Sequence, residues 1–152
     1  MRKVIRKLVD QYKKKAKLEN TPTQTIFRES RKTAGTLRTV YDRKTKKLIK
    51  FELVFPVKIH KLLAKVDAKQ SAKYTNFVVA HEVGHLRHNV NQWDNSRKYH
   101  SFYGQSPVLE KYANHFAAKI TGISTKQYRA IESDLVDKYN AGVRAKKKNR
   151  KP

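Results

Sequence analysis

Two histidines four residues apart, with a glutamate beside the first, are the residues of this chain best suited to chemistry. They form the segment His81-Glu82-Val83-Gly84-His85. On a helix, residues four apart project from the same face, so both imidazoles can reach one metal ion. The glutamate next to the first histidine can accept a proton from water activated by that ion. The segment therefore predicts a zinc site that hydrolyses peptide bonds.

A catalytic zinc site needs a third protein ligand and a position left open for water. We predict Glu110 as this ligand, because it lies in a second expected helix, which starts near Pro107 and can cross behind the first. His100, in the irregular segment between the two helices, is the competing candidate. His88 follows on the first helix, where the motif histidines already use the favourable geometry. A third histidine six residues after the motif is excluded, because Asn91 stands there.

The residues around Glu110 support a close approach of the two helices. Ala113, Ala117 and Ala118 are small enough for the helices to pack tightly. Asn114 falls one turn after Glu110 on the same face, where its side chain could hydrogen-bond a metal ligand or nearby backbone.

These two segments together resemble the ImmA/IrrE family of metallopeptidases. Members of that family combine an H-E-x-x-H helix with a downstream E-x-x-A-N-x-F-A segment. The residues that match the downstream segment are Glu110, Ala113, Asn114, Phe116 and Ala117. The resemblance covers residues 77–118 and implies a zincin-like domain with one zinc ion.

By this resemblance, His81, His85 and Glu110 bind the zinc ion and Glu82 is the general base. The resemblance also implies an intracellular endopeptidase that cleaves a helix-turn-helix repressor, often of a mobile element. The chain departs from the family in the polar segment His88-Asn89-Val90 and in its high positive charge. Both departures bear on the substrate more than on the metal.

The charge of the chain is extreme and unevenly distributed. Its 152 residues carry a formal net charge of +24. Residues 1–80 hold 22 Lys or Arg against 6 Asp or Glu, and residues 141–152 hold 6 basic residues and no acidic one. This excess predicts attraction to polyanions such as nucleic acid, although lysines that merely solvate the surface would give the same composition.

The composition also bears on location. Cysteine is absent, and no segment approaches the ~20 apolar residues needed to cross a bilayer. The basic N-terminus lacks the apolar run of a secretory signal. We therefore expect a cytoplasmic protein without a membrane partner. The oligomeric state does not follow from the sequence.

The elements that must position these residues can be read from periodicity and from helix and strand breakers. We expect helices over residues 2–18, from Lys69 to His88 and from Pro107 to about Ile120, and a helix from Ser124 to Gly142. Residues 60–65 are expected to form a short helical turn. Gly35–Tyr41 and Leu48–Phe55 are expected to form a β-hairpin, and an edge of this hairpin, with Leu48–Phe55 as the first choice, could hold an extended substrate.

The sequence thus predicts one α+β domain of zincin type over residues 1–143, with helices packed on a short antiparallel sheet. Residues 144–152 are expected to form a disordered basic tail. Two alternatives remain open. One is a SprT-like, DNA-associated metalloprotease with His100 as third ligand. The other is a non-catalytic module that binds nucleic acid or protein on the same fold.

Overall fold

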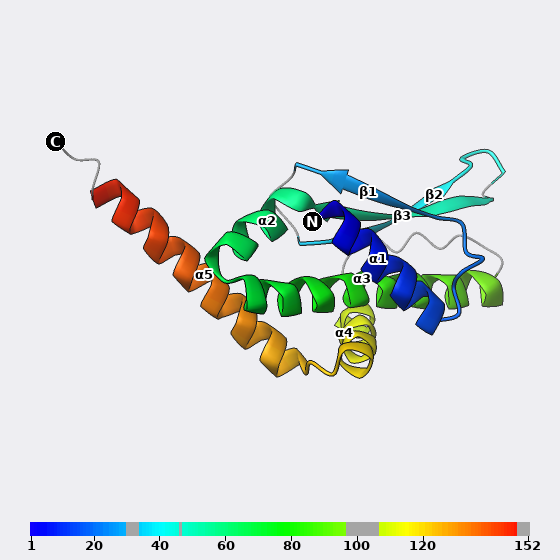
Figure 1. The fold of residues 1–152 in the computed structure, drawn as a ribbon. Helices are drawn as coiled ribbons and strands as arrows, with labels where there is room; N and C mark the ends of the chain where they lie inside the picture. The colour runs from blue at the N-terminus through cyan, green and yellow to red at the C-terminus, as the bar shows by residue number, and fades with distance from the viewer. Residues whose placement is uncertain (30–33, 46, 97–106, 149–152) are drawn as a thin grey trace.

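The fold is a small three-stranded sheet covered by helices, and it confirms the predicted α+β class (Figure 1). The computed structural model describes residues 1–29, 34–45, 47–96 and 107–148; for residues 92–96 and 146–148 only the backbone is described. The elements in chain order are α1 (Arg2–Lys15), β1 (Thr23–Arg28), β2 (Thr36–Tyr41), β3 (Leu48–Pro56), α2 (Val57–Val66), α3 (Ala68–Ser96), α4 (Pro107–Thr121) and α5 (Thr125–Lys148).

The strand order in the sheet is β1-β3-β2. β2 and β3 pair antiparallel as the predicted hairpin, whereas β1 pairs parallel with β3. The central position of β3 contradicts the expectation that Leu48–Phe55 offers a free edge to substrate, because both of its edges are already paired. The prediction failed because β1 was missed. Four of the six residues of its segment Thr23–Arg28 are polar, and the pairing that makes it a strand is made with residues far along the chain.

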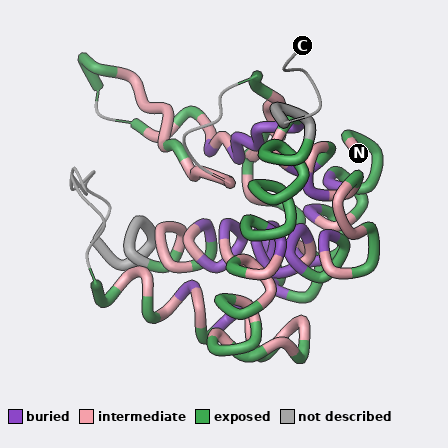
Figure 2. The backbone as a smooth tube through the Cα atoms, turned by 90° about the vertical axis from the view of Figure 1, so that its left-hand side faces the viewer, coloured by how far each residue is buried: buried purple, intermediate pink, exposed green. Residues whose placement is uncertain are grey.

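The hydrophobic core lies between the sheet and α3. Phe51, Leu53 and Phe55 alternate along β3 and are almost fully buried, as expected for side chains on one face of a strand. Figure 2 shows the buried residues gathered along the middle of α3, which carries Phe77 and Val83 into the same cluster. Because α3 runs through the centre of the molecule, the sheet and the other helices pack against it and fix its position.

The first helix closes the core with the stripe Ile5, Val9 and Tyr12. It ends three residues before the predicted end, because Lys17 adopts a left-handed conformation with φ of 59°. The amide of Leu18 then bonds the carbonyl of Lys13, and the chain turns back toward the core in a Schellman-type cap.

The other helix ends also depart in part from the expectations. α3 continues from His88 to Ser96, and α2 is longer than the predicted single turn. Ser124 caps α5 as predicted, since its hydroxyl accepts a hydrogen bond from the amide of Gln127. The predicted end at Gly142 is wrong, because α5 passes through this residue to Lys148. The part of the expected tail at residues 149–152 lies outside the described residues.

Within the described ranges, no helix combines the length and apolar character that a membrane crossing requires. Figure 1 shows the C-terminal half of α5 running away from the other elements.

Candidate metal centre

Two helices that cross closely bring the predicted metal ligands together. α3 supplies His81 and His85 from adjacent turns, and α4 supplies Glu110 from its first turn. The closeness depends on Gly84, because a Cβ atom there would lie 3.0 Å from the Cα atom of Ala113 and 3.1 Å from the ring of Phe116. The small residues Gly84 and Ala113 therefore determine how closely the Glu110 carboxylate approaches the two imidazoles.

The donor atoms of three side chains face one point at the crossing. The Nε2 atoms of His81 and His85 are 3.0 Å apart. The Glu110 carboxylate oxygens lie 3.3 Å from Nε2 of His81 and 3.1 Å from Nε2 of His85. Zinc with tetrahedral bonds of about 2.0–2.2 Å separates its ligand atoms by roughly 3.3 Å. The spacing and the chemistry of this donor set therefore fit a zinc ion.

Asn114 orients the first imidazole. Its Oδ1 atom accepts a hydrogen bond from the Nδ1–H of His81 over 3.1 Å, as the sequence position suggested. Because that proton sits on Nδ1, the lone pair of Nε2 is directed toward Glu110 and His85. A partner of this kind holds a ligand histidine in the tautomer and orientation that a metal requires.

Burial favours the neutral form of both imidazoles. It lowers the pKa of His81, although the nearby Glu110 charge opposes the shift. Burial, reinforced by the proximity of His81, lowers the pKa of His85 to about 4. Since a metal binds the neutral imidazole, protons compete little for these ligands at neutral pH.

Glu82 lines the same cavity as the three ligand side chains and is covered by the start of β2. Only 6% of this residue is exposed. A Cβ atom on Gly35 would lie 2.7–3.0 Å from its side-chain atoms, so any larger residue there would displace the Glu82 side chain. Burial raises the pKa of Glu82 to about 8, and the Glu110 charge adds to the shift, while a hydrogen bond from the amide of Leu37 opposes it. A dication bound beside it would favour the ionised form again.

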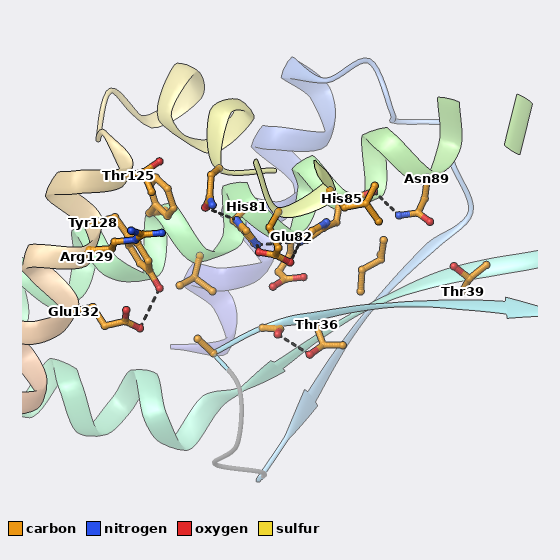
Figure 3. A pocket seen from close by; sticks show the side chains of 18 residues that line it. Thr36, Thr39, His81, Glu82, His85, Asn89, Thr125, Tyr128, Arg129 and Glu132 are labelled. Atoms are coloured by element: carbon orange, nitrogen blue, oxygen red, sulfur yellow. Dashed lines mark hydrogen bonds and ion pairs between the residues drawn. The ribbon is translucent and has the colours of Figure 1, made fainter. Parts of the chain in front are cut away.

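The four residues share a cavity of about 700 Å³ that is walled by β2, α3, α4 and α5. Figure 3 shows His81, Glu82 and His85 on α3 facing β2, which contributes Thr36 and Thr39. The first turns of α5 form another part of the wall. They contribute Thr125, Tyr128, Arg129 and Glu132.

The other histidines that the structure describes take no part in this group. The ring of His88 lies 5.0 Å from that of Tyr112, centroid to centroid, and His115 is exposed on α4. His60 is fully buried on α2, away from the donors. His100, the competing third ligand, lies outside the described residues. In the part of the chain that the structure describes, one set of three or more histidine and acidic side chains could hold a metal, namely His81, His85 and Glu110.

Sequence reasoning found the donors but not what covers them. Gly35 and Leu37 lie more than forty residues before the motif, and no spacing rule connects them to Glu82. The one available signal was a glycine at the start of a β-rich run, which often marks the close approach of another group. The wall supplied by Tyr128, Arg129 and Glu132 had no sequence signal that we recognise.

Comparisons with protein-family models, with curated proteins and with solved structures find no match to this chain.

Proposed function

We propose that this chain is a zinc-dependent endopeptidase in which His81, His85 and Glu110 hold one zinc ion. The observation that carries the proposal is the meeting of these three side chains, whose nearest donor atoms lie 3.0–3.3 Å apart, beside a buried glutamate. A zinc ion held there would supply Lewis acidity and lower the pKa of a water molecule toward about 7.

Glu82 is the general base in this proposal. Its carboxylate would take the proton from the attacking water and pass it to the leaving amine. The cavity gives it access to a substrate, while the surrounding backbone excludes bulk water from its other side. A carboxyl group whose pKa lies above its ordinary value is suited to accept and release a proton near neutral pH.

An extended peptide can reach this site along β2. No described strand pairs with the outer edge of β2, which faces the cavity. The amide of Leu37 is directed to Glu82, and alternation along the strand directs the amide of Thr39 to the same side. A peptide added to this edge would run past the metal group, that is, past His81, His85 and Glu110. This path favours cleavage at a bond inside the peptide and not at its end.

The ImmA/IrrE resemblance remains part of the proposal. The downstream motif is supported by what its residues do: Ala113, Phe116 and Ala117 are buried where α4 meets the core, and Asn114 holds His81. The substrate class that the resemblance implies is an intracellular helix-turn-helix repressor.

Cleavage of a library of quenched fluorescent peptides tests the activity. The wild-type protein loaded with zinc should cleave members of the library, and Glu82→Gln should keep the metal while losing about 10²–10⁴-fold in rate. Retention of the full rate by Glu82→Gln would show that the base is another group.

Metal analysis separates this site from the SprT-like alternative. Glu110→Ala should lose the zinc that copurifies with the wild type, and His100→Ala should keep it. The opposite pattern would assign the third ligand to His100.

A second candidate function, nucleic-acid binding, is favoured by the surface of α1. Arg2 and Arg6 lie over the ring of Phe27, and Lys3, Lys7 and Lys14 are exposed on the outward face. Among the described residues, none of these side chains forms an ion pair, whereas Lys50 and Lys138 do. Unneutralised cations along one helix can release counterions from a phosphate backbone.

Binding of a labelled DNA duplex across a range of salt concentrations tests this second function. Replacing Lys3, Lys7 and Lys14 with Gln should weaken binding and reduce the salt slope by up to about 0.9 per lysine. The matched control replaces three exposed lysines of α4 and α5. They are Lys111, Lys119 and Lys126. Equal losses in the two triple variants would mean that net charge alone, and not α1, attracts DNA.

A further inference from the structure

His60 is a buried histidine that the proposed mechanism does not use. It lies on α2 with no exposed surface, and both ring nitrogens have partners. Its Nε2 atom is 3.0 Å from the carbonyl oxygen of Ala34, and its Nδ1 atom is 2.9 Å from Oγ1 of Thr75 on α3. The ring thus joins α2, α3 and the residues that lead into β2.

The partners determine the state of the ring. A carbonyl oxygen can only accept, so Nε2 carries a proton and donates it to Ala34. Burial lowers the pKa of His60, which favours the neutral ring, although the bond to Ala34 opposes the shift. In the neutral ring Nδ1 then accepts the hydroxyl proton of Thr75. Each hydrogen bond therefore has one direction, and the ring has one orientation.

Ala34 stands directly before the backbone that covers Glu82. Gly35 packs against the Glu82 side chain, and the amide of Leu37 donates to its carboxylate. Leu37 is opposite Leu53 in the pairing of β2 with β3, yet its amide is directed to Glu82 at the other side of the strand. The carbonyl of Ala34, which His60 anchors, and the amide of Leu37 are only three residues apart, so displacement of Ala34 also displaces Leu37.

We propose that His60 is a positioning residue, which anchors the start of β2 so that Gly35 and Leu37 hold the Glu82 carboxylate beside the metal ligands. Its effect on catalysis rests on the proposed peptidase function. The anchoring itself does not, because it concerns contacts among His60, Ala34, Leu37 and Glu82 that exist without substrate.

Two amide substitutions separate the two ring nitrogens. The side-chain nitrogen of Gln reaches about as far as Nε2 of histidine, and that of Asn about as far as Nδ1. His60→Gln should therefore keep the donor to Ala34, whereas His60→Asn should leave the Ala34 carbonyl without it. Both variants place an uncharged amide in the same buried site, so they are matched in polarity.

Hydrogen exchange at the Leu37 amide, followed by NMR in the metal-free protein, tests the anchoring. We expect exchange at least about tenfold faster in His60→Asn than in wild type or His60→Gln. The amide of Phe51, which bonds the carbonyl of Pro22 in another part of the sheet, is the internal reference and should not change. Unchanged exchange at Leu37 in His60→Asn, or equal acceleration at Leu37 and Phe51 in both variants, would overturn the proposal.

Kinetics with a peptide from the library test the catalytic consequence. His60→Asn should lower kcat about 10- to 100-fold with KM and zinc content unchanged, and His60→Gln should restore kcat. Equal kcat in the two variants would overturn the positioning role. If even the wild type cleaves no peptide, the proposed function fails, and exchange at Leu37 still decides whether His60 anchors β2.

Discussion

At the scale of single residues, the site depends on side chains that fix the orientation of other side chains. Asn114 selects the nitrogen that His81 presents, and the Leu37 amide holds Glu82. Neither residue contributes a donor to the metal group. Substitution of Asn114 should therefore change the affinity for the metal while the three donors remain.

Asn114→Ala should lower the affinity for zinc by about 10- to 100-fold, because His81 loses the acceptor that fixes its tautomer. Asn114→Asp keeps an acceptor at the same reach and should bind zinc at least as tightly as wild type. Competition with a chromophoric chelator measures both affinities. Equal affinities in Asn114→Ala and wild type would mean that helix packing alone orients the imidazole.

The stability of the metal-free protein should depend on pH through His60. Its pKa is lowered in the folded state by burial, so below about pH 6.5 the unfolded chain binds more protons than the folded one. The stabilisation by the neutral ring is thus present above pH 6.5 and is lost as the pH falls. Relative to His60→Gln, wild type should lose at most ~1.4 kcal/mol per pH unit below this point. Urea unfolding of both proteins at several pH values measures the difference in their free energies of unfolding. A difference that does not change with pH would mean that folding leaves the pKa of His60 unchanged.

At the scale of elements, the crossing of α3 and α4 is what converts a helix pair into a site. Gly84 has the backbone and the ring of α4 within 3.0–3.2 Å of where a Cβ atom would lie. Because backbone cannot move aside as a flexible side chain can, α4 would have to shift as a unit. Such a shift carries Glu110 away from the two imidazoles.

Gly84→Ala should therefore destabilise the protein by about 1–3 kcal/mol and weaken zinc binding. The matched control is Gly142→Ala in α5, where nothing lies within 4 Å of the added Cβ atom. This change should stabilise the helix by about 0.5–1 kcal/mol, because alanine loses less entropy there. Thermal unfolding and zinc titration measure both effects. A Gly84→Ala variant as stable as wild type would show that the crossing tolerates a wider separation.

At the scale of the whole molecule, the dominant property is the net charge of +24. The described lysine ion pairs are few: Lys50 with Glu52, and Lys138 with Asp67 and Asp134. Repulsion among these positive charges therefore opposes the compact state. Dissolved salt weakens this repulsion, because the Debye length falls to about 10 Å at 0.1 M salt.

Sodium chloride should accordingly raise the free energy of unfolding in urea as the concentration increases from about 0.05 to 0.5 M. The variant with Lys3, Lys7 and Lys14 replaced by Gln should depend less on salt, because part of the repulsion has been removed. Stability that falls with salt in both proteins would mean that attractive pairs outweigh the repulsion.

The sequence by itself determined the two helices that carry His81, His85, Glu110 and Asn114, and which side chains share a face. These features depend on the fixed geometry of a helix, where residues three or four apart are neighbours wherever the helix lies. The hairpin of β2 and β3 was also predicted, since its strands are close in the sequence and separated by a polar turn.

Only the tertiary structure decided that β1 completes the sheet, that β2 faces the metal group, and that His60 and Gly35 act on Glu82. Strand order and edge exposure depend on pairings between segments far apart in the chain, and the local pattern of polar and apolar residues is compatible with several of them. For the same reason the central position of β3 could not be read from Leu48–Phe55 alone. Close contacts such as that of Gly35 with Glu82 exist only after the layers have packed.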